Sequence, residues 1–259
     1  MIDMHSHILY DVDDGCKSIQ DSITIIREMK KIGFDKIVLT PHYIKGSNYV
    51  CDNDTKKQRL NLINQLLKEN EIDVELILGN EVYINDEIDD LIMSKQIFSI
   101  NKTRYILIEL PLYNKINNVE DIIYELKLRG YLPIIAHPER YLYLQQNKQE
   151  LKKIYESGVY FQCNYGSVIG QYGKDAMNLV TYLLENNMVS FMGTDIHKPD
   201  SNVLSNFDQI KKKIIEYVGK DGFKRITCDN IIDVISDKDV EKFNVIRRKK
   251  GFFANFFKW

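Results

Sequence analysis

The histidines of this chain stand at positions where several of them can act together on a metal ion. The five are His5, His7, His42, His137 and His197. On a strand, residues two apart point the same way, so His5 and His7 can bind one ion together. Asp195 and His197 repeat this spacing as a D-x-H pair. A single histidine is more often a hydrogen-bonded structural residue, but all of these lie at or just past the end of a strand-like segment.

Acidic residues follow the same rule. Glu81 ends one apolar segment in the run GNE, Glu109 lies in ILIEL, and Asp195 ends a third segment. An uncompensated carboxylate in such surroundings costs roughly several kcal/mol, and a cation removes that penalty. A combined imidazole and carboxylate set suits Mn, Fe or Zn and disfavours Ca, which prefers oxygen ligands alone. The ligand set is too large for one ion, so we expect at least two metals.

The elements that must position these side chains alternate along the chain. Strand-like apolar segments are predicted at 2–7, 36–42, 74–81, 105–110, 132–137, 159–164 and 189–195. Helical patterns are predicted at 18–32, 55–70, 86–93, 118–129, 147–156, 173–187 and 203–217. This alternation predicts a parallel sheet covered by helices, with active-site residues at the carboxyl ends of the strands. Seven units without a linker favour a closed or nearly closed α/β barrel in one domain over 1–259, with an open doubly wound sheet as the alternative.

Composition and charge narrow the function classes. The chain has 259 residues, 44% hydrophobic and 28% charged, with a formal net charge of -2. This balance is typical of a globular protein with a sizeable core and argues against a general nucleic-acid binder. We find no signal-peptide pattern and no apolar run long enough to span a membrane. Four scattered cysteines without a CxxC pair favour a reducing compartment, so we expect a cytoplasmic protein.

Several short motifs, taken in order, resemble those of a known superfamily. They are DMHSH at 3–7, TPH at 40–42, GNE at 79–81, IEL at 108–110, AHPER at 136–140 and TDIH at 194–197. Together they resemble the PHP (polymerase and histidinol phosphatase) superfamily. The stretch DVDDG at 11–15, with HPER, resembles the metal-dependent protein-tyrosine phosphatases encoded with bacterial capsule and exopolysaccharide genes. The resemblance runs from residue 1 to about residue 235.

This resemblance implies a distorted (β/α)7 barrel of the PHP fold and a site for three metal ions, usually Mn²⁺, with Fe or Zn as alternatives. It implies three ligand groups: His5, His7, Glu81 and Asp195; Glu81, Glu109 and His137; and Asp14, His42 and His197. Asp14 has two acidic neighbours, and for Asp11 and Asp13 we favour a solvated acidic turn. We expect Asp3 to orient a ligand histidine without binding metal itself.

Phosphate binding requires a cation beside the metal ligands. Clustered metals lower the pKa of a bridging water and neutralise phosphate oxygens, which would permit in-line attack and release of the tyrosine phenolate. Arg140 in HPER is the predicted clamp for the phosphate. The family branch carries a second arginine shortly after the D-x-H motif, whereas this chain has none between residues 141 and 224. Lys198 can partly substitute as a point charge, so we predict weaker phosphate affinity than in family members.

The function that these features favour is a manganese-dependent protein-tyrosine phosphatase acting on the tyrosine-rich tail of a bacterial polysaccharide-synthesis kinase. One alternative is a PHP phosphoesterase for a small metabolite such as histidinol phosphate. Another is a non-catalytic regulator that binds the kinase and retains metal for stability. A cysteine-based phosphatase is excluded, because none of the cysteines has an arginine six positions later.

Two further segments carry weaker signals. The run GSVIGQYGK at 166–174 lacks the spacing of a P-loop and is predicted to be a flexible rim loop near the site, beside which Tyr165 could stack on an aromatic substrate. The C-terminal run RRKKGFFANFFKW at 247–259 combines basic and aromatic residues. One interpretation is a terminal segment that docks its aromatic residues on the barrel or is partly disordered. The other is an anchor at the inner face of the membrane.

Overall fold

The structure is a computed structural model that describes residues 1–84 and 96–242. Within these residues, short strands alternate with helices along the chain. The strands are β1 (Ile2–Asp3), β2 (Lys36–Leu39), β3 (His42–Tyr43), β4 (Glu75–Leu78), β5 (Glu81–Tyr83), β6 (Tyr105–Glu109), β7 (Leu132–Ala136), β8 (Tyr160–Asn164) and β9 (Phe191–Gly193). Their pairs are all parallel, as the alternation of strands and helices predicts.

Two parallel sheets join into one barrel. One has the strand order β1-β2-β4, and the other has the order β3-β5-β6-β7-β8-β9. The ring closes where the segment after β1 pairs with the segment after β9. There the Asp195 N–H donates to the His5 carbonyl oxygen over 2.9 Å, and Ser6 forms a parallel bridge with Ile196. The predicted α/β barrel is confirmed, and the open doubly wound alternative is wrong.

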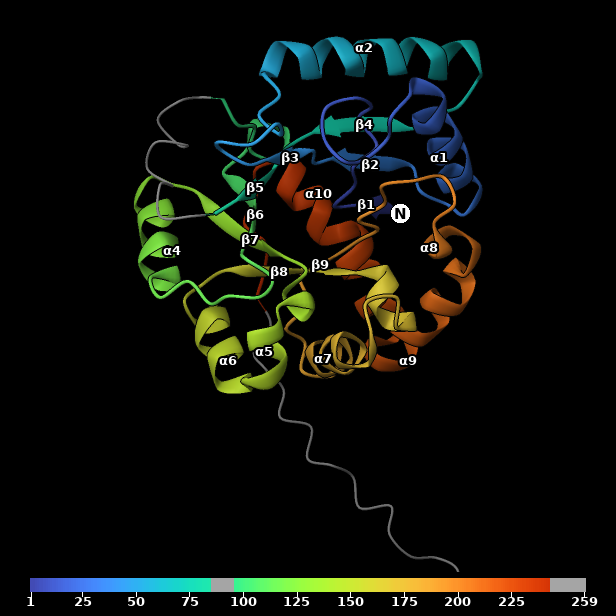
Figure 1. Cartoon of the computed structure of the whole chain (residues 1–259). Helices are drawn as coiled ribbons and strands as arrows, with labels where there is room; N and C mark the ends of the chain where they lie inside the picture. The colour runs from blue at the N-terminus through green and yellow to red at the C-terminus, as the bar shows by residue number, and fades with distance from the viewer. Residues whose placement is uncertain (85–95, 243–259) are drawn as a thin grey trace, which may run out of the picture.

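Helices surround the ring of strands (Figure 1). They are α1 (Ile19–Lys31), α2 (Asn53–Glu69), α4 (Val119–Leu128), α5 (Leu142–Gln146), α6 (Lys148–Glu156), α7 (Lys174–Glu185), α8 (Asn202–Ser205) and α9 (Phe207–Lys224). The first two begin at capping residues: the Ser18 hydroxyl accepts from the Asp21 N–H, and the Asp52 carboxylate accepts from two backbone N–H groups. Such side chains satisfy the orphan donors of a helix N-terminus.

One helix lies across the ring instead of around it. Figure 1 shows α10 (Asn230–Ile235) crossing the strands, and its Ile231 and Val234 belong to the inner core together with barrel residues such as Met4. The segment that follows α10 lies at the strand starts, because the Tyr105 hydroxyl donates to the Lys238 carbonyl oxygen over 2.7 Å. The starting end of the barrel is therefore plugged, and the carboxyl ends of the strands are left for a site.

Two predicted strands are each split into two parts. The segment 36–42 forms β2 and β3, with Pro41 between them, and the segment 74–81 forms β4 and β5. Proline has no N–H to donate to a ladder. The Asn80 side chain holds the segments around this break: its Nδ2 donates to the Pro41 carbonyl oxygen over 2.9 Å, and its Oδ1 accepts from the Phe98 N–H and from Lys56 Nζ. The chain thus changes sheet just before His42 and Glu81.

The remaining predictions agree with the described helices within a few residues, except near the end of the chain. The predicted helix 203–217 begins as the separate α8 and continues as α9 to Lys224, past a non-helical Gly219. The predicted helix 86–93 and the basic-aromatic run 247–259 lie outside the described residues. Among the described residues, every helix is too short or too polar to cross a bilayer.

Candidate metal centre

The predicted ligands converge at the carboxyl edge of the barrel. His5 and His7 follow β1, His42 begins β3, Glu81 begins β5 and Glu109 ends β6. Three further residues come from the other side of the ring: His137 follows β7, and Asp195 and His197 follow β9. Parallel barrels gather side chains at this edge because all their strands end there. The structure therefore brings together residues that are almost two hundred positions apart.

The first group contains His5, His7, Glu81 and Asp195. The Nε2 atoms of the two histidines lie 3.0 Å apart, and each lies 3.3 Å from Glu81 Oε2. Asp195 Oδ1 lies 3.6 Å from His5 Nε2 and 3.4 Å from His7 Nε2. Donor atoms that bind one transition metal at about 2.0–2.2 Å lie roughly 3–3.5 Å from one another. The spacing of this group fits a shared ion.

Glu81 connects this group to a second one. Its other oxygen, Oε1, lies 2.9 Å from His137 Nε2, and Glu109 Oε1 lies 3.6 Å from the same nitrogen. His42 also faces this group, with its Nδ1 3.0 Å from Glu81 Oε2 and 3.8 Å from Glu109 Oε2. The predicted trio of Glu81, Glu109 and His137 is brought together, with His42 as an additional neighbour.

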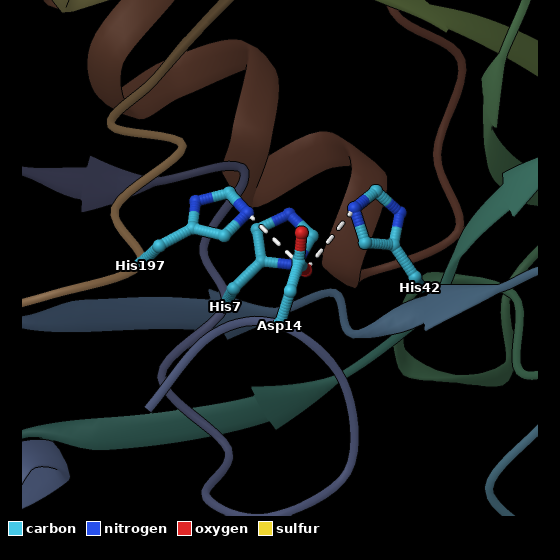
Figure 2. Close-up of side chains that lie close together, drawn as sticks. All are labelled: His7, Asp14, His42 and His197. Atoms are coloured by element: carbon cyan, nitrogen blue, oxygen red, sulfur yellow. Dashed lines mark ion pairs between the residues drawn. The ribbon is translucent and has the colours of Figure 1, made fainter. Parts of the chain in front are cut away.

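The third group contains Asp14, His42 and His197, with His7 beside it (Figure 2). Asp14 Oδ1 lies 3.6 Å from His42 Nε2 and 3.6 Å from His197 Nε2. The ring of His7 stacks on that of His197 at a centroid distance of 4.0 Å. Of Asp11, Asp13 and Asp14, it is Asp14 whose carboxylate lies beside the Nε2 atoms of His42 and His197.

The first two histidines are oriented by residues outside the ligand groups. The His5 Nδ1–H donates to Gln162 Oε1 over 2.8 Å, and the His7 Nδ1–H donates to Asp13 Oδ2 over 2.8 Å. Both Nε2 atoms are thereby turned toward the acidic groups, which is how proteins commonly fix the metal-binding nitrogen of a histidine.

The prediction of a solvated Asp13 is wrong. Its side chain is buried, and it also accepts from the Gly15 and His42 N–H groups. The DDG turn folds back onto His7, and a Cβ at Gly15 would lie 2.1 Å from the His7 carbonyl oxygen. Only glycine permits this close approach. Asp11 is exposed as predicted, and its carboxylate pairs with Arg59.

Two other predictions about nearby residues are also wrong. Asp3 accepts from the Thr194 N–H and hydroxyl, both over 2.7 Å, so it ties β1 to the segment after β9 instead of orienting a histidine ring. Tyr165 is fully buried against Phe34 and Phe207, which prevents it from stacking on a substrate. The predicted rim loop does border the site, since Gln171 and Tyr172 line the adjoining cavity.

The electrostatics of the site favour positive charge. Burial alone would lower the pKa of His5, but Glu81 and Asp195 outweigh burial and raise it to about 9. In turn, the charge of His5 helps to hold the pKa values of Glu81 and Asp195 well below their usual range, although burial opposes this. Glu109 shows the opposite sign, because burial and the charge of Glu81 raise its pKa to about 8. A metal ion that replaced the protons of His5 and Glu109 would therefore bind where the surrounding residues already stabilise positive charge.

Two site residues adopt unusual backbone conformations. His137 has φ 32° and Asp195 has φ 50°, both in the left-handed region. Residues other than glycine seldom adopt this region, and such strain often marks functional sites. Close packing supports the strained segment, since a Cβ at Gly193 would lie 2.7 Å from the His5 Cβ.

Arg140 and Lys198 lie beside the metal ligands. The Arg140 guanidinium donates to Asp195 Oδ2 over 2.7 Å, and its Cζ lies 4.4 Å from the centre of the Tyr172 ring. Lys198 is exposed. A cavity of about 560 Å³ opens between them. Its lining residues are Asp14, Arg140, Gln171, Tyr172, Asp195, His197, Lys198, Asp200, Ser201 and Asn202. Both predicted phosphate-binding cations therefore face the space next to the third ligand group.

The family model for capsular polysaccharide synthesis proteins CpsB/CapC matches residues 1–236. This match spans most of the chain and all of the predicted metal ligands. The chain belongs to the CpsB/CapC family.

Individual family members are similar over most of their length. The putative tyrosine-protein phosphatase CapC of Staphylococcus aureus is 34% identical over 197 residues, which are 76% of this chain and 77% of CapC. The tyrosine-protein phosphatase CpsB of Streptococcus pneumoniae is 30% identical over 246 residues, which are 92% of this chain and 99% of CpsB. A solved structure from work on Bacillus subtilis YwqE and S. pneumoniae CpsB, described as metal-dependent tyrosine phosphatases, matches with TM-score 0.84 and 27% identity over 96% of this chain and all of that one.

In the present chain, three residues of the site were not predicted from the sequence. Gln162 and Asn164 come from β8, which corresponds to 159–164, the one predicted strand segment without a predicted ligand, and Asn164 Nδ2 donates to Asp195 Oδ2 over 2.7 Å. Two amides, two positions apart in an apolar run, are a usable signal, because they share one face of the strand. Tyr172 gave no such signal, since its place over Arg140 depends on how the rim loop folds.

The residues present fit a metal centre of the kind that the relatives' description implies. Glu81 Oε2 is buried and accepts no hydrogen bond from the described residues. A buried polar atom without a partner costs roughly 1–3 kcal/mol. The oxygen faces the nitrogens of three histidines, so a cation among them would satisfy it. Imidazole and carboxylate donors together suit Mn, Fe or Zn.

Proposed function

We propose that this chain is a metal-dependent protein-tyrosine phosphatase. The observation that carries the proposal is the buried Glu81 Oε2, which lies 3.0–3.3 Å from nitrogens of His5, His7 and His42 without a hydrogen bond from the described residues, next to a cavity that Arg140 lines. The family relatives named as tyrosine-protein phosphatases support the substrate class. The predicted ligands His5, His7, Asp14, His42, Glu81, Glu109, His137, Asp195 and His197 would hold the ions in the three groups described above.

The chain's own residues prepare the site for phosphate. Bound divalent ions supply a water of lowered pKa and neutralise phosphate oxygens. Gln162 and Asp13 hold the rings of His5 and His7 in the orientation that ligation needs. Arg140 offers a guanidinium fork at the cavity wall, where phosphate oxygens can accept from it. Because Asp195 anchors Arg140 and Tyr172 covers it, the fork stays beside the ligands without a phosphate present.

We infer that Mn²⁺ is the working metal and that three ions bind. The donor set supports this without excluding Fe or Zn. The partner that we propose is a tyrosine-phosphorylated tail of a polysaccharide-synthesis kinase, an inference from the capsular role of the family. All four cysteines lie in described residues as free thiols, which supports the proposed cytoplasmic location.

The test is substrate preference. With Mn²⁺ added, we expect phosphate release from a phosphotyrosine peptide with kcat/KM at least about tenfold above that for histidinol phosphate or a phosphoserine peptide, a difference of about 1.4 kcal/mol in transition-state binding. A Glu81→Gln variant is the control for contaminating phosphatases and should be inactive. Preference for histidinol phosphate would favour the small-metabolite enzyme. Tight binding of the phosphopeptide without turnover would favour the kinase-binding regulator.

Lys198 is the proposed partial substitute for the family's second arginine. We expect Lys198→Ala to raise the KM for a phosphotyrosine peptide about three- to tenfold, because one exposed point charge contributes modestly to phosphate binding. Lys152→Ala, which removes a lysine paired with Glu156 on the surface of α6, is the matched control. An unchanged KM in Lys198→Ala would remove this residue from the account.

The basic-aromatic run 247–259 supports a proposal of peripheral membrane contact by composition alone. Basic residues attract anionic lipid, and aromatic residues insert at the interface. Deleting 247–259 should abolish co-sedimentation with vesicles that contain anionic lipid. Unchanged sedimentation after the deletion, or no sedimentation of the full chain, would reject this contact.

A further inference from the structure

A second cavity adjoins the first across a shared wall. It has a volume of about 330 Å³. Its lining residues are Leu112, Tyr113, Arg140, Leu142, Gln145, Tyr172, Gly173, Lys174 and Asp175. Arg140 and Tyr172 line both cavities. The pair that borders the proposed phosphate site therefore also borders a space that the proposed chemistry does not use.

The wall between the cavities is held in place from both ends. Arg140 is fixed to Asp195 by a hydrogen bond of 2.7 Å, and Tyr172 stacks over its guanidinium with 4.4 Å between Cζ and the ring centre. A cation over an aromatic face is attracted by the ring. Two further lining residues are held to each other, because the Leu142 N–H donates to the Leu112 carbonyl oxygen over 3.0 Å.

Two of the residues that line this cavity have large, exposed apolar side chains. Tyr113 is 74% exposed and Leu142 is 41% exposed, and both are among the large apolar side chains left exposed in the described part of the chain. Lys174 and Asp175 also line this cavity with opposite charges, and the third charged lining residue, Arg140, is paired with Asp195. Exposed apolar surface in a concave place beside a site indicates a binding surface for an apolar group.

We propose that the second cavity is a subsite for an apolar or aromatic side chain of the polypeptide substrate, two residues away from the phosphotyrosine. This inference rests on the proposed function. In an extended chain, residues two apart point the same way and lie about 7 Å apart. One such side chain can enter each cavity while the intervening residue crosses the Arg140–Tyr172 wall. The subsite would favour a polypeptide substrate over a small phosphate ester.

Variants of the two exposed apolar residues test the subsite. Tyr113→Ala and Leu142→Ala are compared with Tyr124→Ala and Leu128→Ala on α4, whose side chains are 61% and 63% exposed and line neither cavity. Equal thermal unfolding midpoints would show that all variants fold. The substrates are p-nitrophenyl phosphate, a phosphotyrosine peptide with leucine two residues away on both sides, and the same peptide with alanine at those positions.

We expect the ratio of kcat/KM for the leucine peptide to that for p-nitrophenyl phosphate to fall about five- to tenfold in Tyr113→Ala and Leu142→Ala, and in neither control. We also expect the wild type to prefer the leucine peptide over the alanine peptide by a similar factor. That preference should disappear in the two variants, because the two halves of one contact are not independent.

Three results would overturn the subsite, and they differ in what they mean for the proposed function. If the wild type turns over all three substrates but shows no preference for leucine, the subsite is wrong and the proposed function stands. If the leucine preference persists undiminished in both variants, the side chain binds elsewhere. A wild-type protein that hydrolyses neither peptide nor p-nitrophenyl phosphate would overturn the proposed function, and the subsite with it.

Discussion

Replacing Asp13 by asparagine should damage the metal centre although Asp13 is outside the ligand groups. Its Oδ2 accepts from His7 Nδ1 over 2.8 Å and from the His42 N–H over 3.0 Å, while its Oδ1 accepts from the Gly15 N–H over 2.9 Å. An asparagine has a single acceptor oxygen. Whichever way the amide is turned, its NH₂ group meets at least one of these N–H donors.

The size of the effect follows from what is lost. A hydrogen bond to a charged group contributes about 1.5–3 kcal/mol, and the loss of a partner that orients a metal-binding histidine typically costs about 10–100-fold in metal affinity or activity. We therefore expect Asp13→Asn to weaken Mn²⁺ binding and to lower kcat/KM on a phosphotyrosine peptide by about 10–100-fold each. The matched control is Asp11→Asn, two residues away, whose carboxylate makes only an exposed pair with Arg59. Such pairs contribute about 0–1 kcal/mol.

The assay is competition for Mn²⁺ against a chelator of known affinity, followed by phosphate release at saturating metal. The reasoning predicts a large loss for Asp13→Asn and a loss below about twofold for Asp11→Asn, since the latter touches no ligand. Equal behaviour of the two variants would refute it. So would an Asp13→Asn protein that binds Mn²⁺ as tightly as the wild type.

Two further variants test other parts of the account. Arg140→Lys keeps the charge but loses the guanidinium fork, so kcat/KM on a phosphotyrosine peptide should fall about 10–100-fold. The control is Arg104→Lys, at a surface ion pair with Asp237, which should have little effect. Equal losses in the two variants would contradict the role of Arg140 as a phosphate clamp. Burial lowers the pKa of Lys56 to about 8. The unfolded chain keeps this proton up to about pH 10.4, so the unfolded state binds more protons between these values and the wild type gains stability as the pH rises. Urea unfolding should show that the free energy of unfolding of the wild type, minus that of Lys56→Met, increases by about 2–3 kcal/mol from pH 7.5 to 10.5; a constant difference would contradict this shift.

The sequence predicts which side chains gather at the carboxyl edge of the barrel because most of that signal is local. Apart from Asp14, which lies in a turn, each predicted ligand stands at or just past the end of an apolar run, and parallel strands all present that end at one edge. The fold was predicted by the same alternation of strands and helices. The barrel fold and the gathering of strand-end residues at one edge do not depend on how the loops fold. Both predictions therefore agree with the structure, although the strands are shorter than predicted and two of them are split.

The errors concern residues whose role depends on packing between distant segments. Asp13 looks like part of a solvated turn, and only the folding of that turn onto His7 buries it. Asp3 stands beside a histidine in sequence, but its partner Thr194 comes from the far end of the barrel. Tyr165 is polar and lies next to a rim loop, yet it fills a space between two phenylalanines. A pattern along the chain does not specify such contacts.

The measurement that tests the central claim most directly is phosphate release from a phosphotyrosine peptide by protein stripped of metal, before and during titration with Mn²⁺, with the metal content per chain determined in parallel. The account predicts no turnover in the stripped protein, recovery with more than one ion bound per chain, and no recovery in Glu81→Gln. Full turnover without metal, or stoichiometric metal binding without turnover, would contradict it.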